Sequence, residues 1–223
     1  MVVMAFNEAE SLAEVTSEIR DSLERLGRPW EMVIVNDGSA DATGSIADGL
    51  ASESSAVRAV HHPVNQGLGA VYRTGFAEVT SEFVTFLPAD GQIPASSIAP
   101  FVAAMDAGAD MVLGTIPDRP VPLYVRMLSS GERLLYRLLF GSFPAFQGML
   151  MFRRSLLDAV ELTSTGRGWT VIMELIVRTA RRGASLAHVE TGLDARRSGE
   201  SKVTNLRTIL SNFRQVLQLR WDL

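Results

Sequence analysis

Apolar and amphipathic stretches alternate along the first 115 residues of this 223-residue chain. Short apolar runs predict buried strands, and stretches with an apolar residue at every third or fourth position predict helices with one buried face. The alternation of strand and helix favours a parallel sheet with right-handed crossovers. We expect strands at Val2–Ala5, Met32–Val35, Val57–Val60, Phe83–Leu87 and Met111–Gly114, separated by helices at Glu10–Leu26, Asp41–Leu50, Leu68–Val79 and Ser97–Ala107.

The alternation stops at Ile116–Pro122, where three prolines indicate a stiff loop. The last segment, Val203–Leu219, is amphipathic, and both a core-packed helix and a helix lying on a membrane surface fit its pattern. At 223 residues the chain can bury a sizeable core and is most simply one domain, and it has no internal repeat. Between the loop and the last segment we expect a helix at Tyr124–Phe140, a strand at Gln147–Phe152, a helix at Thr170–Arg182 and a strand at Leu186–Val189.

The composition is that of an ordinary globular protein, with 47% hydrophobic and 21% charged residues. The absence of cysteine excludes disulfides and thiolate metal sites. There is no signal-peptide pattern and no run of about 18 apolar residues, so we expect no membrane-spanning helix.

Charge is divided unevenly along the chain. Residues 1–120 hold 6 basic and 17 acidic residues, whereas residues 121–223 hold 15 basic and 8 acidic residues. The acidic part suits a bound metal cation, and the basic part suits phosphate groups or an anionic membrane surface. For most individual charges, a place on a solvated helix face is the simpler explanation.

The most informative stretch is Asn36-Asp37-Gly38-Ser39-Ala40-Asp41-Ala42-Thr43, directly after the apolar run Met32–Val35. Its pattern predicts a turn at Gly38 and then a helix with Ser39 or Asp41 as the N-cap. Carboxylates at the carboxyl end of a parallel strand lie where open α/β sheets bind ligands. Taken alone, the stretch is equally compatible with an ordinary strand–turn–helix junction.

Three further polar segments have comparable positions, and a fourth lies near the end of the chain. Asn7-Glu8, Asn65–Gly69 and Ala89–Gln92 each follow a predicted strand, and Arg197–Lys202 lies near the end. With these five motifs in this order, the chain from about residue 2 to about residue 205 resembles the family 2 glycosyltransferases, and most of all the branch of dolichol-phosphate mannosyltransferase and its bacterial polyprenyl-phosphate relatives. The resemblance implies a single GT-A α/β domain over residues 1–223, with a mostly parallel central sheet flanked by helices. Its donor-binding half would be about 1–115 and its acceptor-binding half about 116–223.

The resemblance also implies a site for a nucleotide-sugar donor and Mg²⁺ or Mn²⁺. Asp90 and Gln92 would be the metal ligands, although Pro88 replaces the first aspartate of the usual Asp-x-Asp motif. These cations accept carboxylate and amide oxygens and share them with phosphate and water. The alternative is that Asp90-Gly91 is only a turn. By resemblance, the donor-binding residues are Ala5, Asn7, Glu8, Asp37, Asn65, Gly67, Ala89 and Asp90, with Asp37 on the base or ribose.

The chemical class of the acceptor decides whether the transfer reaction needs a general base. A phosphate acceptor is already anionic and needs no general base, whereas a hydroxyl acceptor needs one. Glu174 lies where sugar-hydroxyl transferases of this superfamily often carry a base, but it could instead anchor a loop. Arginine and lysine beside a glycine suit a phosphate clamp. By resemblance, the acceptor phosphate would be held by Arg126, Ser130, Arg197, Ser201 and Lys202, with Arg196 as an alternative to Arg197.

From the resemblance we expect inverting transfer of a hexose, from a donor of the GDP-mannose or UDP-glucose type, to a polyprenyl or dolichyl phosphate. The alternatives are a soluble transferase with a hydroxyl acceptor and Glu174 as base, and a sugar-nucleotide-binding protein without turnover, which Pro88 would suit. We expect a cytoplasmic protein in peripheral contact with the inner face of the membrane, and no nucleic-acid partner.

Overall fold

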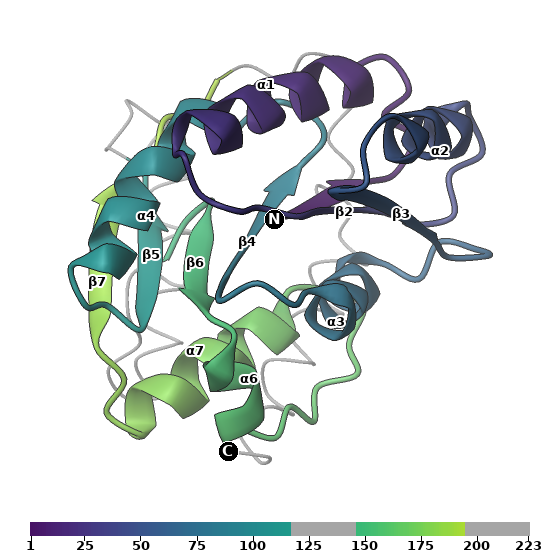
Figure 1. The fold of residues 1–223 in the computed structure, drawn as a ribbon. Helices are drawn as coiled ribbons and strands as arrows, with labels where there is room; N and C mark the ends of the chain where they lie inside the picture. The colour runs from purple at the N-terminus through teal and green to yellow at the C-terminus, as the bar shows by residue number, and fades with distance from the viewer. Residues whose placement is uncertain (117–145, 195–223) are drawn as a thin grey trace, which may run out of the picture.

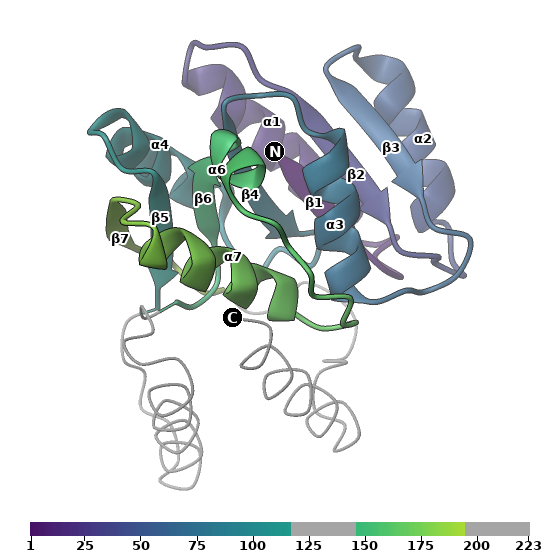
Figure 2. The ribbon, with the colours of Figure 1, turned by 90° about the horizontal axis from the view of Figure 1, so that it is seen from below.

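The computed structural model describes residues 1–116 and 146–194. These residues form three layers, in which a seven-stranded sheet lies between two layers of helices (Figures 1 and 2). The expected helices at Tyr124–Phe140 and Val203–Leu219 lie outside the described residues. Among the described helices, none combines the length and the apolar composition that crossing a bilayer requires.

The sheet has the strand order β3-β2-β1-β4-β6-β5-β7. All neighbouring strands are parallel except β6, which is antiparallel to both β4 and β5. This arrangement confirms the predicted α/β class and the mostly parallel sheet. The strands are β1 (Val2–Ala5), β2 (Met32–Asn36), β3 (Val57–His61), β4 (Phe83–Pro88), β5 (Met111–Thr115), β6 (Leu150–Arg153) and β7 (Leu186–Glu190).

Each face of the sheet is covered by its own set of helices. Helices α1, α2 and α4 cover one face, and α3, α6 and α7 cover the other (Figures 1 and 2). The helical elements are α1 (Leu12–Arg25), α2 (Thr43–Glu53), α3 (Leu68–Glu78), the 3₁₀ turn η1 (Ala95–Ser97), α4 (Ile98–Asp106), α6 (Ser155–Ala159) and α7 (Thr170–Arg181).

The two cores follow from the alternation of side chains along each strand. In β1, Val3 belongs to the core under α1 and α4 with Ile19 and Phe101, whereas its neighbour Val2 belongs to the opposite core with Tyr72. All of these side chains except Tyr72 are fully buried. A sheet buried on both faces explains why its central strands are almost continuously apolar.

One local difference from the sequence prediction is the start of α2. The helix begins at Thr43 with Ala42 before it, so neither Ser39 nor Asp41 is the N-cap. Asp41 still accepts a hydrogen bond from the Thr43 N–H at 3.0 Å. Helix α6 was not predicted, because five residues are too few for a helical period to show in the sequence.

Candidate functional site

The polar segments after β1, β2, β3 and β4 meet at the carboxyl edge of the sheet. These four strands are neighbours and parallel, so their carboxyl ends lie at the same edge. The register pairs Ala5 with Asn36, Asn36 with His61, and Met4 with Pro88. Just beyond β4, the Ala89 N–H donates to the Met4 carbonyl at 2.9 Å. The structure therefore brings together the predicted donor and metal residues that follow these strands.

The hydroxyls of the Asn36–Thr43 motif hold together the loops after β1 and β2, the first and second loops of this edge. The Asn7 N–H donates to Ser39 Oγ at 2.9 Å, and the Glu8 N–H donates to Thr43 Oγ1 at 2.8 Å. In return, Asn7 Oδ1 accepts from the Ala40 N–H at 2.9 Å. Asn7 has φ 53°, a left-handed backbone conformation that asparagine tolerates better than most residues. The motif thus fixes the shape of this part of the edge.

Asp37 connects the second loop to the third loop, which follows β3 and includes residues 62–67. Its Oδ1 accepts from His62 Nδ1 at 2.6 Å and from the Gln66 N–H at 2.9 Å. Its Oδ2 accepts from Asn65 Nδ2 at 2.9 Å and from the Gly67 N–H at 2.8 Å. A carboxylate offers about four lone-pair positions, so these donors fill it. The contacts favour an indirect role in which Asp37 shapes the 65–67 loop; the predicted contact of Asp37 with a base or ribose is untested.

The two histidines make internal contacts. His62 Nε2 lies 2.8 Å from Thr74 Oγ1, so His62 links Asp37 to α3. His61 lies between Asn36 Nδ2 at 3.0 Å and Asp48 Oδ1 at 2.9 Å. Both arrangements fit a structural role for these side chains.

Asp90 and Gln92 lie in the turn after β4. Asp90 is buried, with 5% of its surface exposed, and its Oδ1 accepts from the Gln92 N–H at 3.1 Å. Gly91 between them has φ 71°, which suits glycine. The Gln92 carbonyl accepts from the Asp194 N–H at 2.8 Å, so the segment after β7 lies beside this turn. Sequence reasoning did not place Asp194 here.

The donor set of this turn fits a divalent cation only in part. Within residues 1–116 and 146–194, no group of three His, Cys, Asp or Glu residues is arranged to hold a metal ion. Asp90 and Gln92 supply one carboxylate and one amide oxygen, which are hard ligands of the kind that Mg²⁺ and Mn²⁺ accept. The remaining ligands would have to come from a bound phosphate and water.

The 163–168 segment, which precedes α7, lies against the third loop. A Cβ added at Gly69 would lie 2.0 Å from the Gly166 carbonyl oxygen, and one at Gly67 would lie 2.7 Å from the Arg167 carbonyl oxygen. Arg167 Nη2 donates to Asn65 Oδ1 at 2.7 Å. The lack of a side chain at these two glycines thus permits the close approach of the 163–168 backbone. Arg167 itself was missed, because its partner lies 102 positions away.

Glu174 lies on the inner side of α7 with none of its surface exposed. Its carboxylate accepts from the Thr163 N–H at 2.9 Å, the Thr163 hydroxyl at 2.9 Å, the Ser164 N–H at 2.8 Å and Arg178 Nε at 2.8 Å. Burial alone would raise the pKa of Glu174, but the hydrogen bonds from Thr163, Ser164 and Arg178 outweigh it and lower the pKa. These contacts favour the loop-anchoring interpretation over a general base.

The predicted acceptor residues cannot be placed in this way. Arg126, Ser130, Arg197, Ser201 and Lys202 all lie outside the described residues, as does Arg196.

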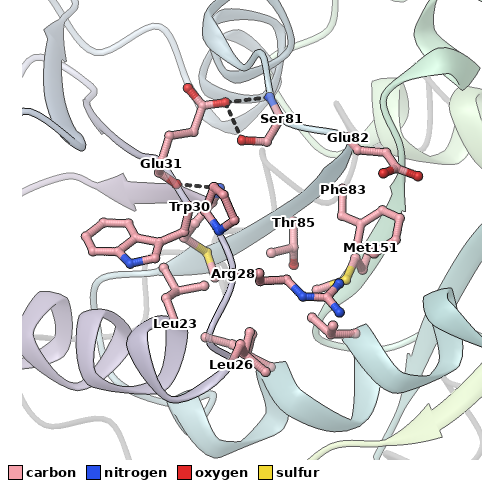
Figure 3. Close-up of a pocket in the computed structure, with 14 residues that line it drawn as sticks. Leu23, Leu26, Arg28, Trp30, Glu31, Ser81, Glu82, Phe83, Thr85 and Met151 are labelled. Atoms are coloured by element: carbon pink, nitrogen blue, oxygen red, sulfur yellow. Dashed lines mark hydrogen bonds between the residues drawn. The ribbon is translucent and has the colours of Figure 1, made fainter.

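A separate cavity of about 320 Å³ lies at the amino edge of the sheet, opposite these loops (Figure 3). Its walls are mostly apolar and include Trp30, Phe83 and Met151, with Arg28 and Glu82 among the charged residues. Arg28 makes two hydrogen bonds to Asp106, at 3.1 and 2.9 Å. The cavity was not predicted, and none of the expected site residues lines it.

A family comparison decides the relationship that these motifs suggested. The model of the family described as "Glycosyl transferase family 2" matches residues 1–160. The chain belongs to this glycosyl transferase family. The resemblance inferred from the five motifs is therefore confirmed.

Two relatives are similar over nearly the whole chain. The chain is 25% identical to the dolichol-phosphate mannosyltransferase of Pyrococcus furiosus, over 100% of its own length and 64% of the relative. It is 32% identical to the undecaprenyl-phosphate 4-deoxy-4-formamido-L-arabinose transferase of Enterobacter sp. (strain 638), over 94% of its own length and 63% of the relative. It thus spans less than two thirds of either relative.

A similar solved structure supports the fold. It is glucosyl-3-phosphoglycerate synthase from Mycobacterium tuberculosis in complex with Mn²⁺ and uridine-diphosphate-glucose. The TM-score is 0.72, with 21% sequence identity, and the match covers 99% of this chain and 78% of the other. At this identity the likeness concerns the fold alone, and it confirms the predicted GT-A α/β fold.

Proposed function

We propose that this chain is the catalytic domain of an inverting glycosyltransferase that moves a hexose from a nucleotide-sugar to a polyprenyl phosphate. Family membership supports sugar transfer, and the names of both relatives specify a lipid phosphate as acceptor. The donor would be of the GDP-mannose or UDP-glucose type. The glucosyl-3-phosphoglycerate synthase complex, with Mn²⁺ and UDP-glucose, is the basis for proposing a divalent metal.

The observation that carries the proposal is the buried carboxylate of Asp90 at the carboxyl edge, beside the loops that follow three neighbouring parallel strands. This is where open α/β sheets bind ligands. Ala5, Asn7, Glu8 and Ala89 would form the walls of the donor pocket together with the loop that holds Asn65 and Gly67. Asp37 would keep that loop in place through its four hydrogen bonds.

A metal at this site would be held by Asp90 and Gln92 and would neutralise charge developing on the departing diphosphate. The protein's own part is to orient the donor and to keep Asp90 buried near its phosphates. In the transfer, an oxygen of the acceptor phosphate forms a bond to the anomeric carbon as the bond to the nucleoside diphosphate breaks. The acceptor arrives as an anion, so no side chain has to remove a proton. Arg126, Ser130, Arg197, Ser201 and Lys202 would bind its phosphate.

Two alternative functions are each suggested by a specific residue. A hydroxyl acceptor would require a base, and Glu174 is the candidate that the family pattern suggests. The Glu174 carboxylate is buried and accepts hydrogen bonds from the Thr163 and Ser164 N–H groups, so the hydroxyl acceptor is the weaker alternative. A binding protein without turnover would explain Pro88, which lies in β4 opposite Met4 and supplies no metal ligand. A membrane-facing, cytoplasmic location is part of the proposal because lipid phosphates reside in membranes.

The proposal is tested by thermal unfolding with GDP-mannose and UDP-glucose, with and without Mn²⁺. A bound donor raises the unfolding temperature by mass action. We expect Asp90→Asn to lose the Mn²⁺-dependent part of this increase. The matched control is Asp106→Asn, which removes a carboxylate in the ion pair with Arg28. An undiminished Mn²⁺-dependent shift in Asp90→Asn would remove Asp90 from the site.

A further inference from the structure

The 163–168 segment is held by Glu174 at one end. At the other end it contacts the loop after β3, which the proposed function assigns to the donor. At the far end, Glu174 of α7 holds the Thr163 and Ser164 N–H groups. Glu174 is in turn paired with Arg178 at 2.8 Å, one helical turn further along. A buried carboxylate that accepts from two backbone N–H groups fixes the position of the chain at that point.

Three kinds of contact, from Ser164 to Arg167, also hold the segment against α3 and the loop after β3. Arg73 Nη1 on α3 donates to the Ser164 and Gly166 carbonyls at 3.2 and 3.3 Å. The Gly69 N–H, in the first turn of α3, donates to the Arg167 carbonyl at 2.9 Å. The Arg167 side chain then reaches Asn65, through its backbone carbonyl at 3.0 Å and its Oδ1 at 2.7 Å.

These contacts form one continuous path to the donor loop. Asn65 Nδ2 donates to Asp37 Oδ2, and the Gln66 and Gly67 N–H groups donate to the same carboxylate. A shift of the 163–168 segment therefore moves Arg167, and Arg167 moves Asn65. The backbones at Gly69 and Gly166 are packed in direct contact, because a single added Cβ at Gly69 would overlap the Gly166 carbonyl.

We propose that Glu174 is a positioning residue for the donor site, acting through the 163–168 segment and Arg167 on the Asn65–Gly67 loop. The inference rests on the proposed function, since it assigns that loop to the donor. A general base requires a lone pair that reaches the acceptor, whereas the carboxylate of Glu174 is fully buried and hydrogen-bonded to the segment it anchors. Glu174 touches neither donor nor acceptor in this role.

The variants Glu174→Gln and Arg167→Gln test the proposal, with Arg28→Gln as the matched control. Arg28 also donates two hydrogen bonds to one partner, but it lies at the opposite edge of the sheet. Residues that act on a site through a network change its affinity by about 2- to 30-fold. We expect the dissociation constant of Mn²⁺ and UDP-glucose or GDP-mannose to rise by this factor in both variants and to stay unchanged in the control.

Turnover separates positioning from base catalysis. With saturating donor, a positioning role predicts that kcat of Glu174→Gln falls less than about tenfold, whereas loss of a general base costs about 10²- to 10⁴-fold. A loss of the larger size with an unchanged donor affinity would overturn the proposal. Arg167→Gln keeps the affinity test of the path available if Glu174→Gln does not fold, since Arg167 is on the exposed side of the same path.

Hydrogen exchange gives a readout that requires no donor. The Gly69 amide is protected by the Arg167 carbonyl, so loosening the segment should speed its exchange by about 2- to 30-fold in Glu174→Gln. Wild-type exchange at Gly69 in that variant would overturn the proposal. If the wild-type protein binds neither donor, the proposed function fails, and the exchange result alone then decides whether Glu174 positions the loop.

Discussion

Replacing Glu31 with glutamine should destabilise the protein without affecting the donor site. Glu31 Oε1 accepts from the Thr80 and Ser81 N–H groups at 2.6 and 2.7 Å and from both hydroxyls, at 3.0 and 2.8 Å. Its Oε2 accepts from Arg58 Nη2 at 3.0 Å. The side chain is 11% exposed and lies beside the amino-edge cavity (Figure 3). It therefore links the start of β2 to β3 and to the start of β4.

The size of the effect follows from the pKa of Glu31. Burial would raise this pKa, but the hydrogen bonds from Thr80 and Ser81 outweigh it and lower the pKa from 4.5 to about 2. Each pKa unit corresponds to about 1.4 kcal/mol, so the charged form contributes up to about 3 kcal/mol to the free energy of unfolding. Glu31→Gln keeps the shape and one acceptor but loses the charge, so we expect a loss of about 2–3 kcal/mol at pH 7.

The sign of the pH dependence provides a second check. The folded pKa is depressed, so the contribution is complete above about pH 4.5 and is lost as the pH falls toward about 2. In urea unfolding, the difference between wild type and Glu31→Gln should therefore shrink steadily below pH 4.5. Glu24→Gln, an exposed change on α1, is the control and should stay within about 0.5 kcal/mol of wild type. A difference that is the same at pH 7 and pH 3 would refute the reasoning, as would a loss of donor binding by the folded variant.

Three further predictions concern other parts of the account. Gly69→Ala should lower the free energy of unfolding by about 1–3 kcal/mol, because its Cβ would lie 2.0 Å from the Gly166 carbonyl oxygen. Gly49→Ala is the control: it has open space around it in α2 and should raise the free energy of unfolding by about 0.5–1 kcal/mol. Equal effects of the two substitutions in urea unfolding would contradict this prediction. Lys202→Ala should reduce transfer to a phosphate acceptor by roughly one to two orders of magnitude while donor hydrolysis persists, as expected when a charge-assisted hydrogen bond is lost, and a near-normal rate would remove Lys202 from the acceptor site. The protein should co-sediment with anionic liposomes at low salt and be released as salt rises, since charges are screened over about 10 Å at 0.1 M; no co-sedimentation at low salt would count against membrane contact.

The order of strands and helices was predictable because each core strand is a short apolar run and each helix has an apolar face. The same pattern placed Asp37 and Asp90 at strand ends, and the parallel sheet then brought them to one edge. The start of α2 was predicted wrongly because Ser39 and Asp41 hydrogen-bond across to residues 7 and 9, which lie 32 positions away. A local capping rule does not contain such a contact.

Long-range contacts also account for what the sequence did not reveal. The partners of Glu31 at Thr80 and Ser81 lie 49 and 50 positions away, and nothing near Glu31 in the sequence indicates them. The contact of Arg167 with Asn65 is invisible for the same reason. The role of Glu174 was left open between a base and a loop anchor, since both place a carboxylate on an apolar helix. Only the hydrogen bonds of its carboxylate favour the anchor.

The central proposal, sugar transfer to a lipid phosphate, is tested most directly by one assay of product formation. The wild-type protein is incubated with Mn²⁺, each labelled nucleotide-sugar, and either a polyprenyl phosphate or the matching polyprenol. The account predicts a labelled sugar–phosphate lipid from the phosphate acceptor and none from the alcohol, with formation dependent on Asp90. Transfer to the alcohol, or donor binding without turnover on either acceptor, would contradict it.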